Sequence, residues 1–254
     1  ADRVRLMRVE RATGKHEDWL VNWDAVPQHW DFAADGTLLF EAEYHARLLA
    51  YAWNGTGEPK PLTQGGTVSA VTPVAGGRVA LLRQTLSAAS ELHVLPQSGG
   101  AAARITSFTE EGAARHHTGE VRELLFEGSR GESVQMFIVL PPGHREGTRY
   151  PLIKVVHGGP HATSSDVFHF RWSPQAFAAP GYVVALVNFQ GSTSWGQDFA
   201  QRIQGAWGDR PLGDTMKAVD ALVASGLVDE KRMAMAGGSY GGYMASWIEA
   251  NTDR

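Results

Sequence analysis

The most constraining stretch lies near the end of the sequence, where an apolar run leads into a glycine-rich turn around a serine. Met233–Ala236 is a short apolar run typical of a buried strand. It continues into Gly-Gly-Ser-Tyr-Gly at residues 237–241, and residues 243–250 favour a helix. A strand, a tight turn with serine at its apex and a helix indicate a nucleophile elbow, in which the serine has a strained backbone. We therefore predict that Ser239 is a catalytic nucleophile, although the five-residue pattern alone would also suit a connection with an incidental serine.

A second element upstream supplies hydrogen-bond donors for such a site. A mostly apolar, β-branched run ends at Val156 and is followed by His-Gly-Gly-Pro. In α/β-hydrolases the oxyanion hole takes one backbone N–H from the residue after the nucleophile and another from the loop after the third strand. The sequence thus predicts Tyr240 and Gly159 as the two donors, with Gly158 as a weaker candidate. His157 stands at a strand end, and we expect it to shape this loop rather than to act as the base.

Composition argues against several classes of function. The 254 residues carry a net charge of −4 with Lys and Arg scattered, which disfavours nucleic acid or an anionic membrane as partner. No apolar run is long enough to span a membrane, and the given chain shows no signal peptide, so we expect a cytoplasmic protein. The absence of cysteine excludes disulfides, thiol catalysis and Cys-ligated metals. The ten histidines show no His-Glu-x-x-His spacing, and neither a metal nor a cofactor is expected.

Residues 1 to about 108 repeat a pattern of short strands separated by turns. Arg5–Val9 resembles Arg47–Tyr51, and the turn at residues 35–36 resembles that at residues 76–77, with offsets of about 40 to 45 residues. Four short strands per repeat of this length are typical of a β-propeller blade, with a β-sandwich as the alternative. Because a propeller closes with about four to eight blades, this partial set of repeats predicts that further blades lie outside the chain.

The pattern of predicted strands and helices changes after a polar stretch at residues 109–120. We assign residues 1–116 to the C-terminal blades of a β-propeller and residues 117–254 to a second domain. The second domain is expected to begin with a hairpin and then to alternate strands with helices, which predicts a mostly parallel sheet with helices on both faces. Ser239 would then lie at the carboxyl end of its strand, where such sheets bind ligands.

Three helices are expected between the two motifs. They cover residues 173–179, 197–204 and 213–224. In the last of them, Asp214 falls in the first turn and is expected to favour the helix dipole, while Asp220 is expected on the solvated face. Neither carboxylate is therefore assigned a part in chemistry.

Four motifs follow one another in the second half of the chain. They are His157–His161, Asn188–Gly196, Trp207-Gly208 with Asp214, and Gly238–Tyr243. In this order and spacing they closely resemble the prolyl oligopeptidase family of serine peptidases, nearest its acylaminoacyl-peptidase branch. The resemblance is strong over residues 120–254 and looser before them. It implies a β-propeller joined to an α/β-hydrolase domain, with the propeller admitting only small or unfolded substrates.

The chain departs from this family's pattern in two ways. The family usually has arginine and glycine where this chain has Gln190 and Ser194, so an ion pair beside the site is expected to be lost. The catalytic triad of this fold runs Ser, Asp or Glu, His. After Ser239, however, only Glu249 and Asp253 carry a carboxylate, and no histidine follows. We therefore expect a fragment whose triad Asp and His come from the remaining segment of the same polypeptide.

The resulting expectation is a serine hydrolase that cleaves short peptides, as an acylaminoacyl-peptidase or a dipeptidyl- or oligopeptidase, through an acyl-enzyme. A carboxylesterase needs the same groups and is the alternative among enzymes. Outside enzymes, the alternative is an inactive fragment or binding scaffold. The sequence leaves open the residue preference, the choice between exo- and endo-cleavage, and whether the protein forms a homo-oligomer.

Overall fold

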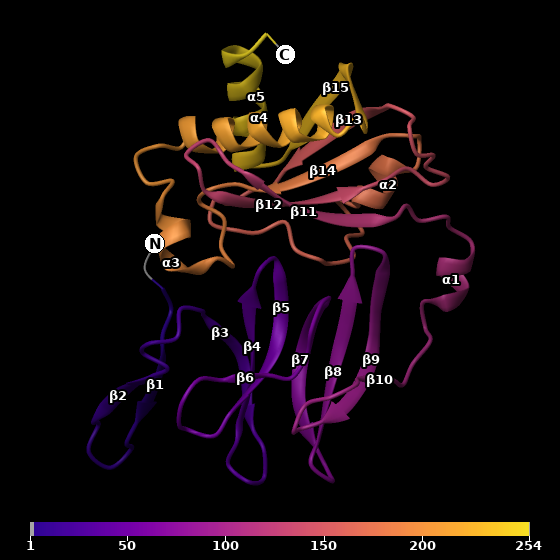
Figure 1. The fold of residues 1–254 in the computed structure, drawn as a ribbon. Helices are drawn as coiled ribbons and strands as arrows, with labels where there is room; N and C mark the ends of the chain where they lie inside the picture. Colours follow the sequence, from indigo (N-terminus) through magenta and orange to yellow (C-terminus); the bar gives the residue numbers. More distant parts are fainter. Residues whose placement is uncertain (1–2, 254) are drawn as a thin grey trace. The chain divides into compact units, whose positions relative to one another are not determined.

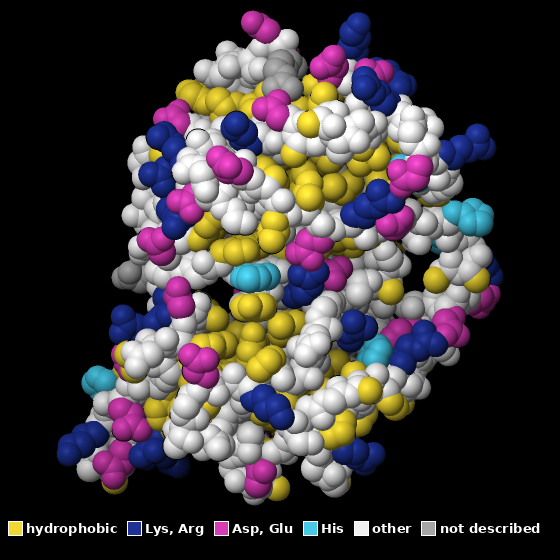
Figure 2. Space-filling model, in the orientation of Figure 1, with side chains coloured by type: hydrophobic (Ala, Val, Ile, Leu, Met, Phe, Trp, Pro, Cys, Tyr) yellow, Lys and Arg dark blue, Asp and Glu magenta, His cyan; other side chains and the backbone are white. Residues whose placement is uncertain are grey.

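The computed structural model describes residues 3–253, which fall into two compact units (Figure 1). Unit 1 comprises Ala1–Glu111 and Ser165–Val167, and unit 2 comprises Gly112–Ser164 and Phe168–Arg254. Within residues 3–253, no helix is both long and apolar enough to cross a membrane. Acidic and basic side chains are interspersed over the face shown in Figure 2, as expected from their scattering along the sequence.

Unit 1 is built from antiparallel strands that pair with their sequence neighbours. A hairpin of two strands is followed by a sheet of order β3-β4-β5-β6 and a second sheet of order β10-β9-β8-β7. The strands are β1 (Leu6–Val9), β2 (His16–Trp19), β3 (Pro27–Phe32), β4 (Leu38–Tyr44), β5 (Arg47–Trp53), β6 (Lys60–Pro61), β7 (Thr67–Val74), β8 (Arg78–Thr85), β9 (Ala88–Pro96) and β10 (Ala103–Arg104). Each four-stranded sheet is therefore a meander.

The two meanders carry the sequence repeat. Glycine with positive φ turns the chain between the first two strands of each sheet, at Gly36 in one and at Gly76 and Gly77 in the other. Apolar residues of both sheets then meet in one buried cluster, which includes Leu39 from β4 and Leu81 from β8. β4 is buried on both faces, because Leu38, Phe40 and Ala42 point away from Leu39 and join a second apolar cluster. Along β8, by contrast, the buried residues Val79 and Leu81 alternate with more exposed ones.

Unit 2 contains a five-stranded mixed sheet of order β11-β12-β14-β13-β15. Its elements are β11 (Val121–Glu127), β12 (Ser133–Val139), β13 (Tyr150–Val156), α2 (Pro174–Ala178), β14 (Val183–Asn188), α3 (Gly196–Gln201), α4 (Asp209–Ala224), β15 (Val228–Gly237) and α5 (Tyr240–Asn251), with α1 (Glu110–Ala114) before them. β13 pairs in parallel with β14 and β15, whereas β12 is antiparallel to β11 and β14. The sheet is mixed because its first two strands form a hairpin and need no crossover helix.

The core of unit 2 lies between this sheet and its helices. All six residues of β14 are buried, as expected for a central strand covered on both faces. α4 and α5 lie along one face of the sheet (Figure 1) and contribute Val219 and Ile248 to the same buried cluster. α4 begins four residues before the expected residue 213, because Pro211 is compatible with the first turn of a helix.

Candidate active site

Ser239 lies at the turn between β15 and α5. β15 ends at Gly237 and α5 begins at Tyr240, so the strand, turn and helix expected from the sequence are present. The φ and ψ of Ser239 are 57° and −124°, a backbone conformation that residues with a side chain rarely adopt. Such strain costs on the order of 1–3 kcal/mol and persists only where the surrounding structure fixes it.

Glycines on both sides of Ser239 fix this turn by allowing backbones to touch. A Cβ atom on Gly237 would lie 2.4 Å from the backbone carbonyl of Gly241, and a Cβ on Gly241 would lie 2.2 Å from the carbonyl oxygen of Val156. These clashes involve backbone atoms, so rotating a side chain would not relieve them. The turn is therefore clamped between its own helix and the end of β13.

The loop after β13 runs beside Ser239. A Cβ atom on Gly158 would lie 3.5 Å from Cβ and 4.0 Å from Oγ of Ser239. Gly159 has a φ of 117°, and a Cβ there would lie 2.7 Å from the backbone nitrogen of His161, so the turn requires glycine. The structure thus brings the predicted oxyanion loop next to the predicted nucleophile.

The side chain of Tyr240 is held by contacts away from Ser239, which leaves only its backbone N–H as a possible donor in the turn. The ring is buried between Phe189 and Trp207, at centroid distances of 5.7 and 5.6 Å. Its hydroxyl donates a hydrogen bond of 2.7 Å to the Trp207 carbonyl, and burial raises the pKa of the phenol well above its usual value. As the first residue of α5, Tyr240 has a backbone N–H for which the helix itself provides no acceptor.

His157 holds the loop through both ring nitrogens. Nδ1 lies 2.7 Å from the Gly158 carbonyl, which can only accept, so Nδ1–H donates and Nε2 accepts from the Ser192 hydroxyl at 2.8 Å. The ring also stacks on Phe189, with centroids 4.3 Å apart. Burial lowers the pKa of His157 to about 4, so the imidazole is neutral at pH 7. These contacts are those of a residue that shapes the loop.

The segment after β14 joins this loop at several further points. The Thr193 N–H donates to the Ala162 carbonyl at 3.0 Å, and His161 Nδ1 lies 3.1 Å from the Gly191 carbonyl. These contacts explain why the Asn188–Gly196 motif accompanies the His-Gly-Gly-Pro motif. The segment after β14 thus supports the backbone of the loop after β13.

Asp214 corrects the sequence expectation. Because α4 begins at Asp209, this residue lies in the second turn, and its side chain is completely buried rather than placed at the helix terminus. The carboxylate accepts hydrogen bonds from backbone N–H groups of Ser129, at 2.9 Å, and Gln190, at 2.8 Å. Sequence reasoning missed this group because its partners lie far away along the chain. The available signal was that Asp214 belongs to one of the four motifs.

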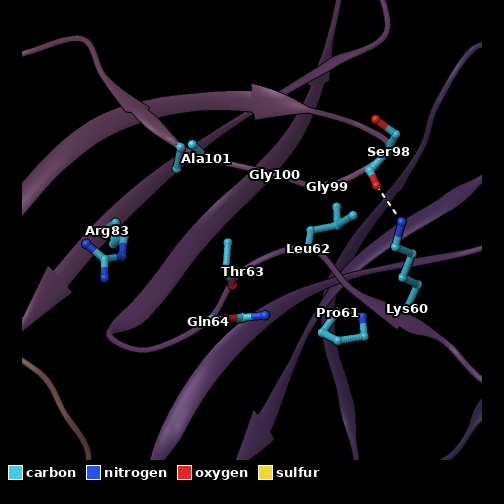
Figure 3. A pocket seen from close by; sticks show the side chains of 11 residues that line it. Lys60, Pro61, Leu62, Thr63, Gln64, Arg83, Ser98, Gly99, Gly100 and Ala101 are labelled. Atoms are coloured by element: carbon cyan, nitrogen blue, oxygen red, sulfur yellow. Dashed lines mark hydrogen bonds between the residues drawn. The ribbon is translucent and has the colours of Figure 1, made fainter.

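Unit 1 contains a cavity of about 600 Å³, whereas Ser239 belongs to unit 2. Its lining includes the segment from Lys60 to Gln64, Arg83 and the segment from Ser98 to Ala102 (Figure 3). Lys60 Nζ donates to the Ser98 carbonyl at 2.5 Å across the cavity wall. The Lys60 ammonium therefore already has a hydrogen-bond acceptor within unit 1.

Comparison with known families matches the last third of the chain, which carries Ser239. Residues 168–254, which include Ser239 and its turn, match the model of the prolyl oligopeptidase family. The resemblance to the prolyl oligopeptidase family is confirmed. Among curated proteins, the probable dipeptidyl-peptidase 5 of Aspergillus clavatus is 30% identical over 238 residues, which cover 91% of this chain and 33% of that protein. The uncharacterized peptidase YuxL of Bacillus subtilis is 33% identical over 166 residues, or 65% of this chain and 25% of that protein.

Solved structures show the same fold over nearly the whole chain. The acylaminoacyl peptidase of Pyrococcus horikoshii has a TM-score of 0.81 at 22% identity and is matched over 94% of this chain and 38% of its own. A puromycin-hydrolyzing peptidase of Mycobacterium tuberculosis has a TM-score of 0.74 at 20% identity, over 98% of this chain and 40% of its own. The chain spans about a third of the length of the curated dipeptidyl-peptidases that it matches.

Proposed function

We propose that this chain is part of a serine peptidase that cleaves short peptides through an acyl-enzyme formed on Ser239. The observation that carries the proposal is the backbone of Ser239, whose φ of 57° is enforced by glycine contacts on both sides of the turn. A strained serine between a strand and a helix presents its hydroxyl above the sheet, as nucleophilic attack requires.

In this proposal the oxyanion that forms during attack is bound by the backbone N–H groups of Tyr240 and Gly159. The proximity of the Gly158–Gly159 segment to Ser239 supports this assignment. Each donor would contribute about 10²- to 10³-fold to turnover, because it acts on charge that develops in the transition state. The chain covers about a third of the curated relatives' length, and in this proposal the triad Asp and His lie in the part of the polypeptide that this chain does not span.

The architecture proposed for the two parts follows the family. Residues 1–116 would be the C-terminal blades of a β-propeller, which the two consecutive four-stranded meanders support. Residues 117–254 would be part of an α/β-hydrolase domain, which the parallel pairing of β13 with β14 and β15 supports. The names of the relatives, dipeptidyl-peptidase and acylaminoacyl peptidase, favour short peptides as substrates.

The proposal is tested by labelling the native polypeptide with a fluorophosphonate probe and measuring its intact mass. We expect one adduct, located on Ser239, and none in Ser239→Ala. The matched control is Ser246→Ala, which removes an exposed serine from α5, the helix that follows Ser239, and should leave labelling intact. Assays with peptide and aryl-ester substrates then separate the alternatives. Ester cleavage without peptide cleavage would indicate a carboxylesterase, and no adduct in the native polypeptide would indicate an inactive scaffold.

A further inference from the structure

A buried carboxylate on α4 is hydrogen-bonded to the segment that contacts the predicted oxyanion loop, and it takes no direct part in the proposed reaction. Asp214 is completely inaccessible to solvent. Its Oδ1 accepts from both the backbone N–H and the hydroxyl of Ser129, each at 2.9 Å. Its Oδ2 accepts from the Gln190 backbone N–H at 2.8 Å, and the Gln190 amide lies 3.2 and 3.3 Å from the two oxygens. One side chain therefore ties the β11–β12 turn and the segment after β14 to α4.

The backbone around this carboxylate is fitted closely to it. A Cβ atom on Gly128 would lie 2.7 Å from Asp214 Oδ1, and a Cβ on Gly213 would lie 2.5 Å from Cβ of Ser129. The β11–β12 turn and α4 therefore approach each other only because both positions are glycine. The close packing restricts the movement of the carboxylate, as is required of a group that holds other residues in place.

The contact between Asp214 and Gln190 leads directly to the predicted oxyanion loop. Gln190 is followed by Gly191 and Ser192, and the Ser192 N–H is bonded back to the Phe189 carbonyl at 2.9 Å, which closes a tight turn. The same turn holds His157 by a hydrogen bond from the Ser192 hydroxyl and by stacking of the Phe189 ring. His157 in turn bonds the carbonyl of Gly158, the residue beside Ser239.

Neutral groups supply all of the hydrogen bonds that Asp214 accepts. They are two backbone N–H groups, a hydroxyl and an amide. The nearest buried cation is Lys154, whose charge interacts with Asp214 but whose Nζ has no hydrogen-bond partner among residues 3–253. The carboxylate is thus fixed by geometry through these donors rather than by a direct ion pair.

We propose that Asp214 is a positioning residue of this site, which holds the turn at Phe189–Ser192 and, through it, the His157–Gly159 segment against Ser239. The proposal rests on the proposed function for its kinetic consequence. Its structural consequence, a fixed oxyanion loop, can be measured without any turnover.

The principal test is Asp214→Asn in the native polypeptide. An asparagine has the same shape but only one acceptor oxygen, so it can satisfy either the Ser129 or the Gln190 arm and places an N–H₂ group against the other. We expect kcat to fall about 10- to 100-fold, because small displacements of catalytic groups have large effects, while KM changes less than about twofold. Hydrogen exchange of amides in residues 157–162 and 189–193 should become faster.

Three further variants make the test specific. Asp220→Asn makes the same chemical change at an exposed position of α4 and should alter neither kcat nor the exchange of these loops. Ser129→Ala removes a donor from the other arm of Asp214 and should lower stability with a much smaller effect on kcat. Ser192→Ala breaks the link to His157 without changing Asp214, and we expect it to reproduce the faster exchange of residues 157–162. It also provides the test if Asp214→Asn fails to fold.

The outcomes separate this proposal from the proposed function. Wild-type kcat and unchanged loop exchange in Asp214→Asn would overturn the positioning role, as would equal losses of kcat in Asp214→Asn and Ser129→Ala. Unchanged exchange of residues 157–162 in Ser192→Ala would overturn it as well. If the wild-type polypeptide cleaves neither peptides nor esters, the proposed function fails, and loop exchange alone decides the positioning role.

Discussion

The imidazole of His157 lies flat against the ring of Phe189, with an angle of 12° between the two planes and 4.3 Å between their centroids. This stacking joins the end of β13 to the turn after β14, and the Phe189 ring also lies 5.7 Å from the ring of Tyr240, the residue after Ser239. Both ring nitrogens of His157 are also hydrogen-bonded, Nδ1 to the Gly158 carbonyl in its own loop and Nε2 to the Ser192 hydroxyl in the turn after β14. The residue is therefore a structural part of the site, and its ionisation has consequences for stability.

The stability of unit 2 should depend on His157 in acid. The pKa of His157 is about 4 in the folded protein, compared with 6.5 for an unperturbed histidine, because burial disfavours the imidazolium. Between these values the unfolded chain binds a proton that the folded chain does not, so stability falls as pH drops from 6.5 to 4. We expect His157→Gln to reduce this acid loss in urea titrations at a series of pH values. The exposed His117→Gln serves as control, and an acid loss identical in all three proteins would contradict the assignment.

Lys154 should destabilise the fold at neutral pH. Burial lowers the pKa of its ammonium well below 10.5, and Asp214 opposes this only in part. Between the folded pKa and 10.5 the unfolded chain binds the additional proton, so stability rises with pH through this range. We expect Lys154→Met to increase the free energy of unfolding at pH 7, because a methionine side chain of similar length avoids the desolvation cost that burial imposes on the ammonium. The gain should shrink as pH approaches 10.5.

Urea unfolding at pH 7 and pH 10 measures this effect. Lys217→Met removes an exposed lysine from α4 and should change stability little at either pH. A loss of stability in Lys154→Met at pH 7 would show instead that the Lys154 ammonium stabilises Asp214, and the two charges would then have to be treated as a favourable pair.

The contrast between Ser239 and Asp214 shows what the sequence could reveal. The turn at Ser239 is a local structure, so its glycines, its strand and its helix are all contiguous, and their pattern predicts it. The hairpin expected at the start of the second domain is likewise present, formed by β11 and β12, since a hairpin is defined by alternation and a short turn. Asp214, by contrast, meets Ser129 across 85 residues and Gln190 across 24. The periodicity of apolar residues does not predict contacts between segments so far apart in the chain. Because α4 begins earlier than the sequence predicted, Asp214 lies in the second turn and in the core rather than at the helix terminus.

The glycine at position 241 should be required for folding. A Cβ there would lie 2.2 Å from the Val156 carbonyl oxygen, a backbone atom that can move only if β13 moves. We expect Gly241→Ala to lower the free energy of unfolding by about 3 kcal/mol or more, at the upper end for overpacked positions. Gly112→Ala is the control, because no atom lies within 4 Å of its Cβ and alanine favours the helix there. Thermal unfolding of both variants decides the point, and a stable Gly241→Ala would contradict the close approach of α5 to β13.

A substitution of Gly158 should instead lower reactivity at Ser239 while leaving the stability of the fold nearly unchanged. A Cβ on Gly158 would lie 3.3 Å from the Gly238 carbonyl oxygen and 3.5 Å from Cβ of Ser239, so alanine fits after a shift of a few tenths of an ångström. That shift moves the oxyanion loop away from Ser239. If the proposed function is correct, we expect Gly158→Ala in the native polypeptide to react about tenfold or more slowly with a fluorophosphonate, because a displaced donor stabilises the transition state less. Its melting temperature should stay close to that of the wild type. An unchanged labelling rate, with alanine in place, would show that this loop does not contact the oxyanion.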